Sequence, residues 1–214
     1  MTIRSTGGRV AAYAWLVFAV LNFVDLFVGI TGDPDYSLTT ATIAFVLLLG
    51  CGIAYTVGLR PAIVGDDEAL TVRNPLRDIR APWAAIHRIE GKNAVTVRFT
   101  GRDGTELETR AWVHQTSPRA QAKAEARAQK QARKSQGAGL DLTGRTPTGF
   151  AAQQLNEMRD RHRPKTKSGA PDQAAAAETE EPARGSVTWS VPAVAALAVP
   201  LAGLLAALIV SSAG

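Results

Sequence analysis

The placement of the apolar residues constrains this chain more than any other feature, because they gather in three long runs near its two ends. The runs cover residues 10–30, 41–58 and 189–210, and Asp25 is their only charged side chain. A helix of about 20 apolar residues can cross a hydrocarbon core of about 30 Å. The first run is too long for the apolar part of a signal peptide, and no small-residue cleavage site follows it. The sequence therefore predicts three retained transmembrane helices.

The basic residues predict how these helices are oriented. Lys and Arg total 24 against 19 Asp and Glu, and Arg4 and Arg9 are the only two that lie outside residues 60–184. The loop at residues 31–40 contains two Asp residues but no Lys or Arg. Positively charged loops tend to stay in the cytoplasm. We therefore expect a multi-pass protein of the cell membrane with a cytoplasmic N-terminus and middle domain and an extracytoplasmic C-terminus.

Two polar residues lie inside the first apolar run, namely Asn22 and Asp25. An ionisable residue within a membrane helix is a candidate for a transport or proton pathway. Asp25 is close to the outer end of the run, however, where its carboxylate can reach interfacial water. A small transporter component that uses Asp25 is therefore kept only as a remote alternative. The single cysteine, Cys51, lies in the second apolar run and reads as a small apolar residue.

Between the second and third runs the pattern changes to short stretches that alternate with period two, which is typical of strands. The clearest strand covers residues 94–100, with Val95, Val97 and Phe99 on one face, and residues 101–104 form a hairpin turn after it. We expect further strands at 61–64, 69–74, 76–81 and 105–114, and a bend at 82–86. The predicted core includes Val72 and Trp83 together with the three inward residues of the clearest strand.

A different composition follows the expected strands. Residues 116–145 begin with a segment rich in Ala, Gln, Lys and Arg that has no apolar stripe, so we interpret them as a basic insertion, either helical or disordered. At residues 146–163, Thr146 can cap a helix and Pro147 suits its first position. The apolar face of this helix is expected to consist of Phe150, Ala151, Gln154, Leu155 and Met158.

The fold class expected from these patterns is α+β, with three transmembrane helices and a small cytoplasmic antiparallel β domain closed by a C-terminal capping helix. In chain order the expected segments are a cytoplasmic N-terminus (1–9), a first span (10–30), an extracytoplasmic loop (31–40), a second span (41–58), the β domain (59–115), the basic insertion (116–145), the capping helix (146–163), a linker (164–188) and a third span (189–210).

Several motifs in the middle of the chain resemble those of one family. They are Arg60-Pro61, Leu70-Thr71-Val72-Arg73-Asn74-Pro75-Leu76-Arg77, Pro82-Trp83 and the closing Arg110-Ala111-Trp112. These residues resemble the small bacterial pleckstrin-homology (PH) domains of actinobacterial membrane proteins of uncharacterised function. The resemblance covers residues 60–115 and extends to the helix at 147–161. It implies a curved antiparallel sheet with a C-terminal helix, and a fold of this kind does not fix a function.

The sequence offers no catalytic or metal site and implies no cofactor or small-molecule substrate. His87, His114 and His162 lack the spacing of metal ligands, and there is no phosphate-binding loop and no nucleophile elbow. We therefore do not expect an enzyme.

Binding to lipid or protein is the more plausible class of function. In eukaryotic PH domains that bind phosphoinositides the first hairpin loop is basic, whereas residues 65–68 here are acidic and would repel a phosphate. Arg73, Arg77, Arg80 and Arg88 form an alternative basic patch that could contact lipid or a partner. We prefer a membrane-anchored adaptor or assembly factor that binds a membrane or cytoplasmic protein, with binding of anionic lipid headgroups as the alternative. Nucleic acid is an unlikely partner because aromatic residues do not interleave with the basic ones.

Overall fold

The computed structural model describes residues 1–30, 32, 36–113, 147–162 and 183–213 of the chain. The expected basic insertion at 116–145 and most of the expected linker at 164–188 lie outside these residues. The chain divides into two compact units. The sheet unit comprises Met1–Arg4 and Ala62–Thr188, and the helical unit comprises Ser5–Pro61 and Trp189–Gly214. We describe each unit by itself.

Within the described residues, the helical unit contains three helices long enough and apolar enough to cross a membrane, at Thr6–Val28, Leu38–Leu59 and Val191–Ser212. The first is α1 (Thr6–Val28), the second consists of α2 (Leu38–Ile53) continued by the π-helix η1 (Ala54–Leu59), and the third is α6 (Val191–Ala213). The first helix starts earlier than the expected residue 10, because the Ser5 side chain accepts a hydrogen bond from the Gly8 N–H and caps it.

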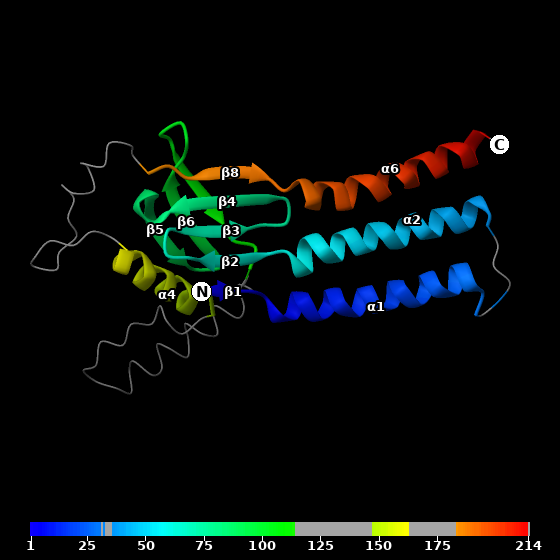
Figure 1. Cartoon of the computed structure of the whole chain (residues 1–214), viewed down its shortest axis with the longest axis horizontal. Coiled ribbons are helices and arrows are strands. Elements are labelled where there is room, and N and C mark those ends of the chain that lie inside the picture. Colours follow the sequence, from blue (N-terminus) through cyan, green and yellow to red (C-terminus); the bar gives the residue numbers. More distant parts are fainter. Residues whose placement is uncertain (31, 33–35, 114–146, 163–182, 214) are drawn as a thin grey trace, which may run out of the picture. The chain divides into compact units, whose positions relative to one another are not determined.

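The three helices of this unit pack with α2 in the middle, as Figure 1 shows. Glycines set the closest approaches. A Cβ atom at position 52 would overlap the Ala196 carbonyl oxygen of α6, and one at position 203 would overlap the Phe45 ring of α2. In lipid, helices gain little from burying apolar surface, so small residues that let two backbones approach closely supply the packing instead.

The sheet unit contains two antiparallel sheets (Figure 1). The five-stranded sheet has the order β1-β2-β3-β4-β8, and the three-stranded sheet has the order β5-β6-β7. The 3-10 turn η2 (Trp83–Ala85) connects the two sheets between β4 and β5. The strands are β1 (Thr2–Ile3), β2 (Ala62–Gly65), β3 (Ala69–Arg73), β4 (Arg77–Pro82), β5 (Ile86–Gly91), β6 (Val95–Thr100), β7 (Glu106–Arg110) and β8 (Ser186–Trp189).

Three of these strands were not predicted from the sequence. In β5 the pairing with β6 shifts between Ile86 and Arg88, so the buried Ile86 and Ile89 are three residues apart and the period of two is broken. The strand β1 has two residues and falls in the segment interpreted as a plain N-terminus. The strand β8 ends the expected linker and places Trp189 in a strand rather than in the third span, which begins at Val191. Its Val-Thr-Trp run favours extended backbone and pairs with the edge of β4.

One hydrophobic core lies between the two sheets and the helix α4 (Pro147–His162). Residues of both sheets that are fully or almost fully buried contribute to it. The helix α4 contributes Leu155, whose side chain has no exposed surface. The six residues expected in the core are all buried, namely Val72, Trp83, Val95, Val97, Phe99 and Leu155. Burying such side chains contributes about 1.5–3 kcal/mol each, so this core is the main source of stability in the sheet unit.

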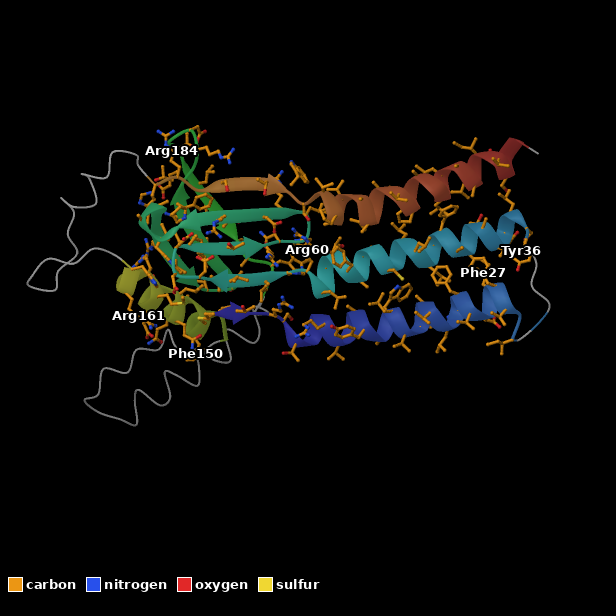
Figure 2. All side chains as sticks on the ribbon, in the orientation of Figure 1. Phe27, Tyr36, Arg60, Phe150, Arg161 and Arg184 are labelled. Atoms are coloured by element: carbon orange, nitrogen blue, oxygen red, sulfur yellow. The ribbon has the colours of Figure 1, made fainter. Side chains whose placement is uncertain are left out.

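The helix α4 packs with a different face from the one expected. Its buried residues lie along one helical face and are Thr148, Gly149, Ala151, Ala152 and Leu155. Phe150 lies outside this face and is 53% exposed (Figure 2), whereas Met158 is partly buried against the core. The sequence-based assignment of Phe150 to the apolar face is therefore wrong. Small residues occupy the contact because α4 lies very close to β5, and a Cβ atom at Gly91 would overlap the Thr148 carbonyl.

Three side chains of α4 also bind the backbone of β5 and of the turn that follows it. Thr148 Oγ1 donates to the Lys92 carbonyl at 2.7 Å, Asn156 Nδ2 to the Ile89 carbonyl at 3.1 Å, and Arg159 to the His87 carbonyl at 3.2 Å. Because β5 is an edge strand of its sheet, these bonds satisfy acceptors at an edge that could otherwise pair with another chain. The helix thus caps the three-stranded sheet.

Candidate interaction surfaces

An arginine of β4 pairs with two of the three carboxylates in the acidic turn between β2 and β3. Arg80 donates to Asp66 and to Glu68, both at 3.2 Å. The other carboxylate oxygen of Asp66 accepts the N–H of Ala69 at 2.6 Å and that of Glu68 at 3.0 Å. The Ala69 N–H, then that of Glu68 and the Arg80 charge, hold the pKa of Asp66 below its ordinary value. The Asp66 carboxylate therefore organises this turn, and the Arg80 side chain is bound to carboxylates of its own domain.

Trp83 ties the same turn to the capping helix. Its indole Nε1 donates to the Asp66 carbonyl oxygen at 2.9 Å, and its ring stacks on His162 with a centroid distance of 5.8 Å and an interplanar angle of 10°. His162 lies in the last turn of α4. Trp83 is thus a structural residue of the core and not an exposed platform for a ligand.

The outer face of the three-stranded sheet has a hollow lined by charged side chains. Glu90 pairs with Arg88 and, at 3.3 Å, with Lys92, while Arg98 pairs across the strands with Glu108 at 2.8 Å. The hollow has a volume of about 240 Å³. We call this the charged hollow, and its lining consists of Arg88, Glu90, Lys92, Asn93, Ala94, Thr96, Arg98, Glu108 and Arg110.

Electrostatics inside the charged hollow favour the ionised forms of its members. The hydrogen bond from Lys92, and then the charges of Arg88 and Lys92, lower the pKa of Glu90. The hydrogen bond and charge of Glu108 raise the pKa of Arg98. Four cations and two carboxylates therefore share one concave face, and charges of both signs are accessible to a bound molecule.

The structure divides the four predicted basic residues between the two sheets. Arg73 and Arg77 lie on β3 and β4, as does Arg80 with its two carboxylates, whereas Arg88 lies on β5 and belongs to the charged hollow. All four side chains are exposed. The basic patch expected from these four residues is thus divided between strands of the two sheets.

Sequence reasoning missed Asn74, which joins the two sheets at one end. Its side-chain amide donates to the Arg110 carbonyl at 3.0 Å and its side-chain oxygen accepts the Trp112 N–H at 2.9 Å. An asparagine before a proline signals a turn but not a partner that lies 36 positions away. Glu90 and Lys92 were missed because the strand β5 was not predicted.

The polar residues inside the first span were predicted as candidates for a pathway. The Asn22 amide donates to the Phe18 carbonyl of its own helix at 2.8 Å, so this donor is engaged locally. Asp25 lies in the last turn of α1, and its carbonyl accepts the N–H of Gly29 at 2.8 Å where the helix ends. Within the described part of the chain, no group of three or more His, Cys, Asp or Glu side chains is placed to hold a metal ion.

Comparison with known families identifies the domain that carries these surfaces. Residues 60–131 match the family model described as bacterial PH domain, which is about a third of the 214 residues. The chain contains a PH-like domain. The match spans β2 to β7 and ends before α4, so the helix belongs to the PH-like domain by its packing rather than by this comparison. PH domains are in general interaction modules rather than enzymes. No curated protein and no solved structure matches the chain.

Proposed function

We propose that this chain is a membrane-anchored adaptor or assembly factor whose PH-like domain binds a protein partner at the charged hollow. The observation that carries the proposal is the pairing of charges in this hollow, where Glu90 and Glu108 lie beside Arg88, Lys92 and Arg98. A surface that alternates cations and anions can match the charge pattern of one protein and repel others, so it provides specificity.

The same pairing argues against an anionic membrane surface as the ligand of this domain. Attraction to such a surface is about 1 kcal/mol for each Lys or Arg near it, and it falls when carboxylates lie next to the cations. Arg80, Arg88 and Arg98 each have a carboxylate partner within the domain. The alternative, recognition of lipid headgroups by Arg73, Arg77, Arg80 and Arg88 acting together, is also weakened because they lie on two sheets.

A partner is expected to dock on the face of the sheet rather than to add a strand. The edge strand β5 is bound by side chains of α4, and the opposite edge strand β7 presents Glu106, Glu108 and Arg110 as exposed charges. Charged edge strands resist pairing with further chains. The open concave surface of this sheet is therefore the charged hollow.

The proposal places this domain in the cytoplasm. Support comes from the basic residues that flank the first two spans on the side of the domain, namely Arg4, Arg9 and Arg60, and from the two Asp residues in the loop between the spans. Tethering to the membrane raises the effective concentration of the PH-like domain for membrane-bound partners. A modest intrinsic affinity would then suffice for function.

The proposal is tested with a charge exchange, Arg98→Glu combined with Glu108→Arg, in the full-length chain. The exchange keeps the net charge and the cross-strand ion pair but reverses its polarity. Cells that express the wild type or the variant are crosslinked, and the proteins that remain attached after detergent extraction are identified. We expect a defined set of partners with the wild type that falls at least tenfold with the exchange.

The matched comparison is Arg80→Gln, which removes one positive charge from the other sheet. Protein binding at the charged hollow predicts that this variant keeps its partners. Loss of partners with Arg80→Gln but not with the exchange would contradict the proposal. A wild-type chain that retains no protein partner would also contradict it.

A further inference from the structure

The charged hollow holds more positive than negative charge. Among the described residues that line it four are basic, whereas the acidic ones are Glu90 and Glu108. The Glu90 side chain is 25% exposed, but those of its two partners, Arg88 and Lys92, are 65% and 78% exposed. One recessed carboxylate thus pairs with two exposed cations. The charge that a bound molecule meets on the β5 side of the hollow is therefore positive.

The register of the strands places two cations of the hollow directly opposite each other. Arg88 of β5 is aligned with Arg98 of β6, and like charges at opposite positions of neighbouring strands destabilise a sheet. Glu90 and Glu108 each offset one member of this pair through an ion pair. Because Glu90 also pairs with Lys92, it does not neutralise both of its partners. A negatively charged ligand would relieve the repulsion that remains.

Arg110 of β7 supplies the fourth cation. It is exposed, lines the hollow and is aligned with Thr96 of β6, which in turn is aligned with Glu90 of β5. Neighbouring strands are about 4.8 Å apart, so two strand spacings separate Arg110 from Glu90, with the short Thr96 side chain between them. No acidic residue in the described part of the chain forms an ion pair with Arg110. A carboxylate from another molecule can therefore approach Arg110 above Thr96.

We propose that the charged hollow binds an acidic segment of its protein partner, in which an Asp or Glu side chain pairs with Arg110. This inference rests on the proposed function of the hollow and adds the chemistry of the partner. Glu108 is 54% exposed and repels a carboxylate placed on its own side of the hollow. The acidic group is thus confined to the end of the hollow near Arg110 and the β5–β6 turn, where Lys92 lies.

Two other anionic ligands fit the hollow less well. An anionic membrane presents a layer of phosphates, and those that approach Glu108 are repelled. A nucleic-acid strand presents a row of phosphates, and none of the described residues that line the hollow is an aromatic side chain on which its bases could stack. A protein segment can place a carboxylate beside Arg110 and a neutral or basic residue beside Glu108, so it satisfies both charges.

The test uses carbodiimide, which joins a carboxylate to an amine without a spacer and so requires direct contact. Arg110→Lys in the full-length chain keeps the positive charge and supplies an amine at this position. Membranes isolated from cells that express the variant are treated with the reagent, and mass spectrometry identifies the linked residues. We expect an amide bond between the amine at position 110 and an Asp or Glu of a second protein.

Two controls accompany this experiment. Arg102→Lys places an amine in the exposed turn after β6, outside the hollow, and should give no such bond. Glu90 and Lys92, whose charged groups lie 3.3 Å apart, should couple within the chain in both variants. This internal product shows that the reagent reaches the hollow.

A further variant measures how much the charge of Arg110 contributes. In intact cells crosslinked as for the charge exchange, Arg110→Gln should reduce the retained partner about tenfold, the lower end of the loss for a hydrogen bond to a charged group. Arg102→Gln should leave the amount unchanged. An Arg110→Gln variant that keeps the partners lost by the exchange would overturn the acidic segment, although protein binding at the hollow would stand.

Three further outcomes would also overturn the inference. The amine at position 110 could couple to carboxylates of this chain alone, within one molecule or between copies. Arg110→Gln could lose bound phospholipid in place of protein, which would assign the cations to lipid headgroups. A wild-type chain that retains no protein would contradict the proposed function and this inference together.

Discussion

In each unit of this protein a helix packs very closely against a neighbouring element, but different interactions hold it there. In the sheet unit, α4 lies against β5 around Gly91, and a buried leucine and three side-chain hydrogen bonds to the strand backbone hold it there. In the helical unit, α2 and α6 contact each other at two glycines. Gly52 of α2 faces the backbone of α6, and Gly203 of α6 faces an aromatic ring of α2.

The difference follows from the solvent of each unit. In water, burying an apolar side chain is favourable, so a leucine stabilises the contact and the polar groups around it find partners. Between helices in lipid that driving force is missing, and close van der Waals packing through small residues replaces it. Large-to-small substitutions should therefore destabilise the sheet unit most. Small-to-large substitutions should destabilise the helical unit most.

The largest effect is expected for Leu155→Ala in the sheet unit. Leu155 is fully buried between both sheets, so the substitution should leave a cavity and lower the free energy of unfolding by about 2–5 kcal/mol. Urea unfolding of the full-length protein measures it, followed by the fluorescence of a variant in which Trp83 is the one tryptophan kept of the four. Phe150→Ala, five positions earlier on the exposed side of α4, should cost less than about 0.5 kcal/mol. Equal losses for the two variants would contradict the helix face described above.

The next largest effect is expected for Gly52→Ala in the helical unit. The added methyl group overlaps the Ala196 carbonyl, and overpacking of this kind typically costs about 1–3 kcal/mol. Thermal unfolding in detergent measures the loss. Gly7→Ala is the matched control, because a Cβ atom there meets nothing within 4 Å. If both substitutions stabilise their helix equally, the close contact of α2 with α6 is wrong.

A smaller effect is expected for Thr148→Val, which keeps the shape of a buried side chain but removes its hydroxyl group. The Lys92 carbonyl then loses the hydrogen bond from Thr148, and because this bond is only partly buried the expected cost is the net value of a typical hydrogen bond, about 0.5–1.5 kcal/mol. Hydrogen exchange of the amides in β5 should become faster in this variant. Unchanged exchange throughout β5 would show that the hydrogen bonds from α4 contribute little to the edge strand.

The smallest effect concerns pH and the acidic turn of the sheet unit. Because the folded-state pKa of Asp66 is lowered, its stabilising contribution is present above the ordinary aspartate pKa of about 3.9 and is lost as the pH falls below that value. Asp66→Asn should therefore be less stable than the wild type at neutral pH and should approach it in acid. Glu90 and Asp103 also have lowered pKa values, so part of the acid dependence remains. Parallel stability curves from pH 7 to pH 3 would contradict this role of Asp66.

Much of this fold was predictable from the sequence because its patterns are local. Apolar runs of sufficient length predicted the three helices, and the alternation at residues 94–100 predicted β6. The strand β5 was not predicted because its bulge separates two buried isoleucines by three positions. The face of α4 was misjudged because the sequence does not show how close the helix lies to Gly91, where Thr148 and Ala152 make the contact and Phe150 stays exposed.

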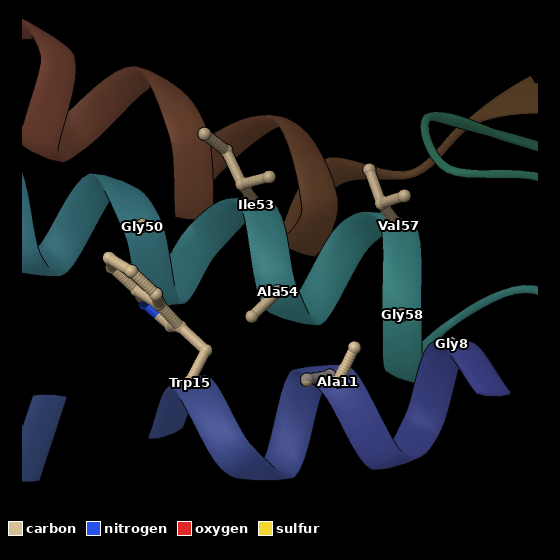
Figure 3. A pocket seen from close by; sticks show the side chains of 9 residues that line it. Gly8, Ala11, Trp15, Gly50, Ile53, Ala54, Val57 and Gly58 are labelled. Carbon is tan, nitrogen blue, oxygen red and sulfur yellow. The ribbon is translucent and has the colours of Figure 1, made fainter. Parts of the chain in front are cut away.

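The candidate surfaces were less predictable because they depend on pairing across strands. Arg80 looked like a free cation in the sequence, yet its two carboxylates lie 12 and 14 positions away in a turn. The charged hollow combines three strands, one of which was not predicted. The apolar groove between α1 and the second span, shown in Figure 3, depends on the crossing of Gly8 and Gly58, which no local pattern specifies.

The central claim is that the charged hollow of the PH-like domain recognises a protein. The most direct measurement places one photoreactive amino acid at Asn93, which lines the hollow, or at Gln153, an exposed position of α4 that does not line it. Both full-length proteins are irradiated in intact cells, and mass spectrometry identifies the adducts. The account predicts protein adducts from position 93 that position 153 does not form. Phospholipid adducts in place of protein at position 93, or the same protein adducts from both positions, would contradict it.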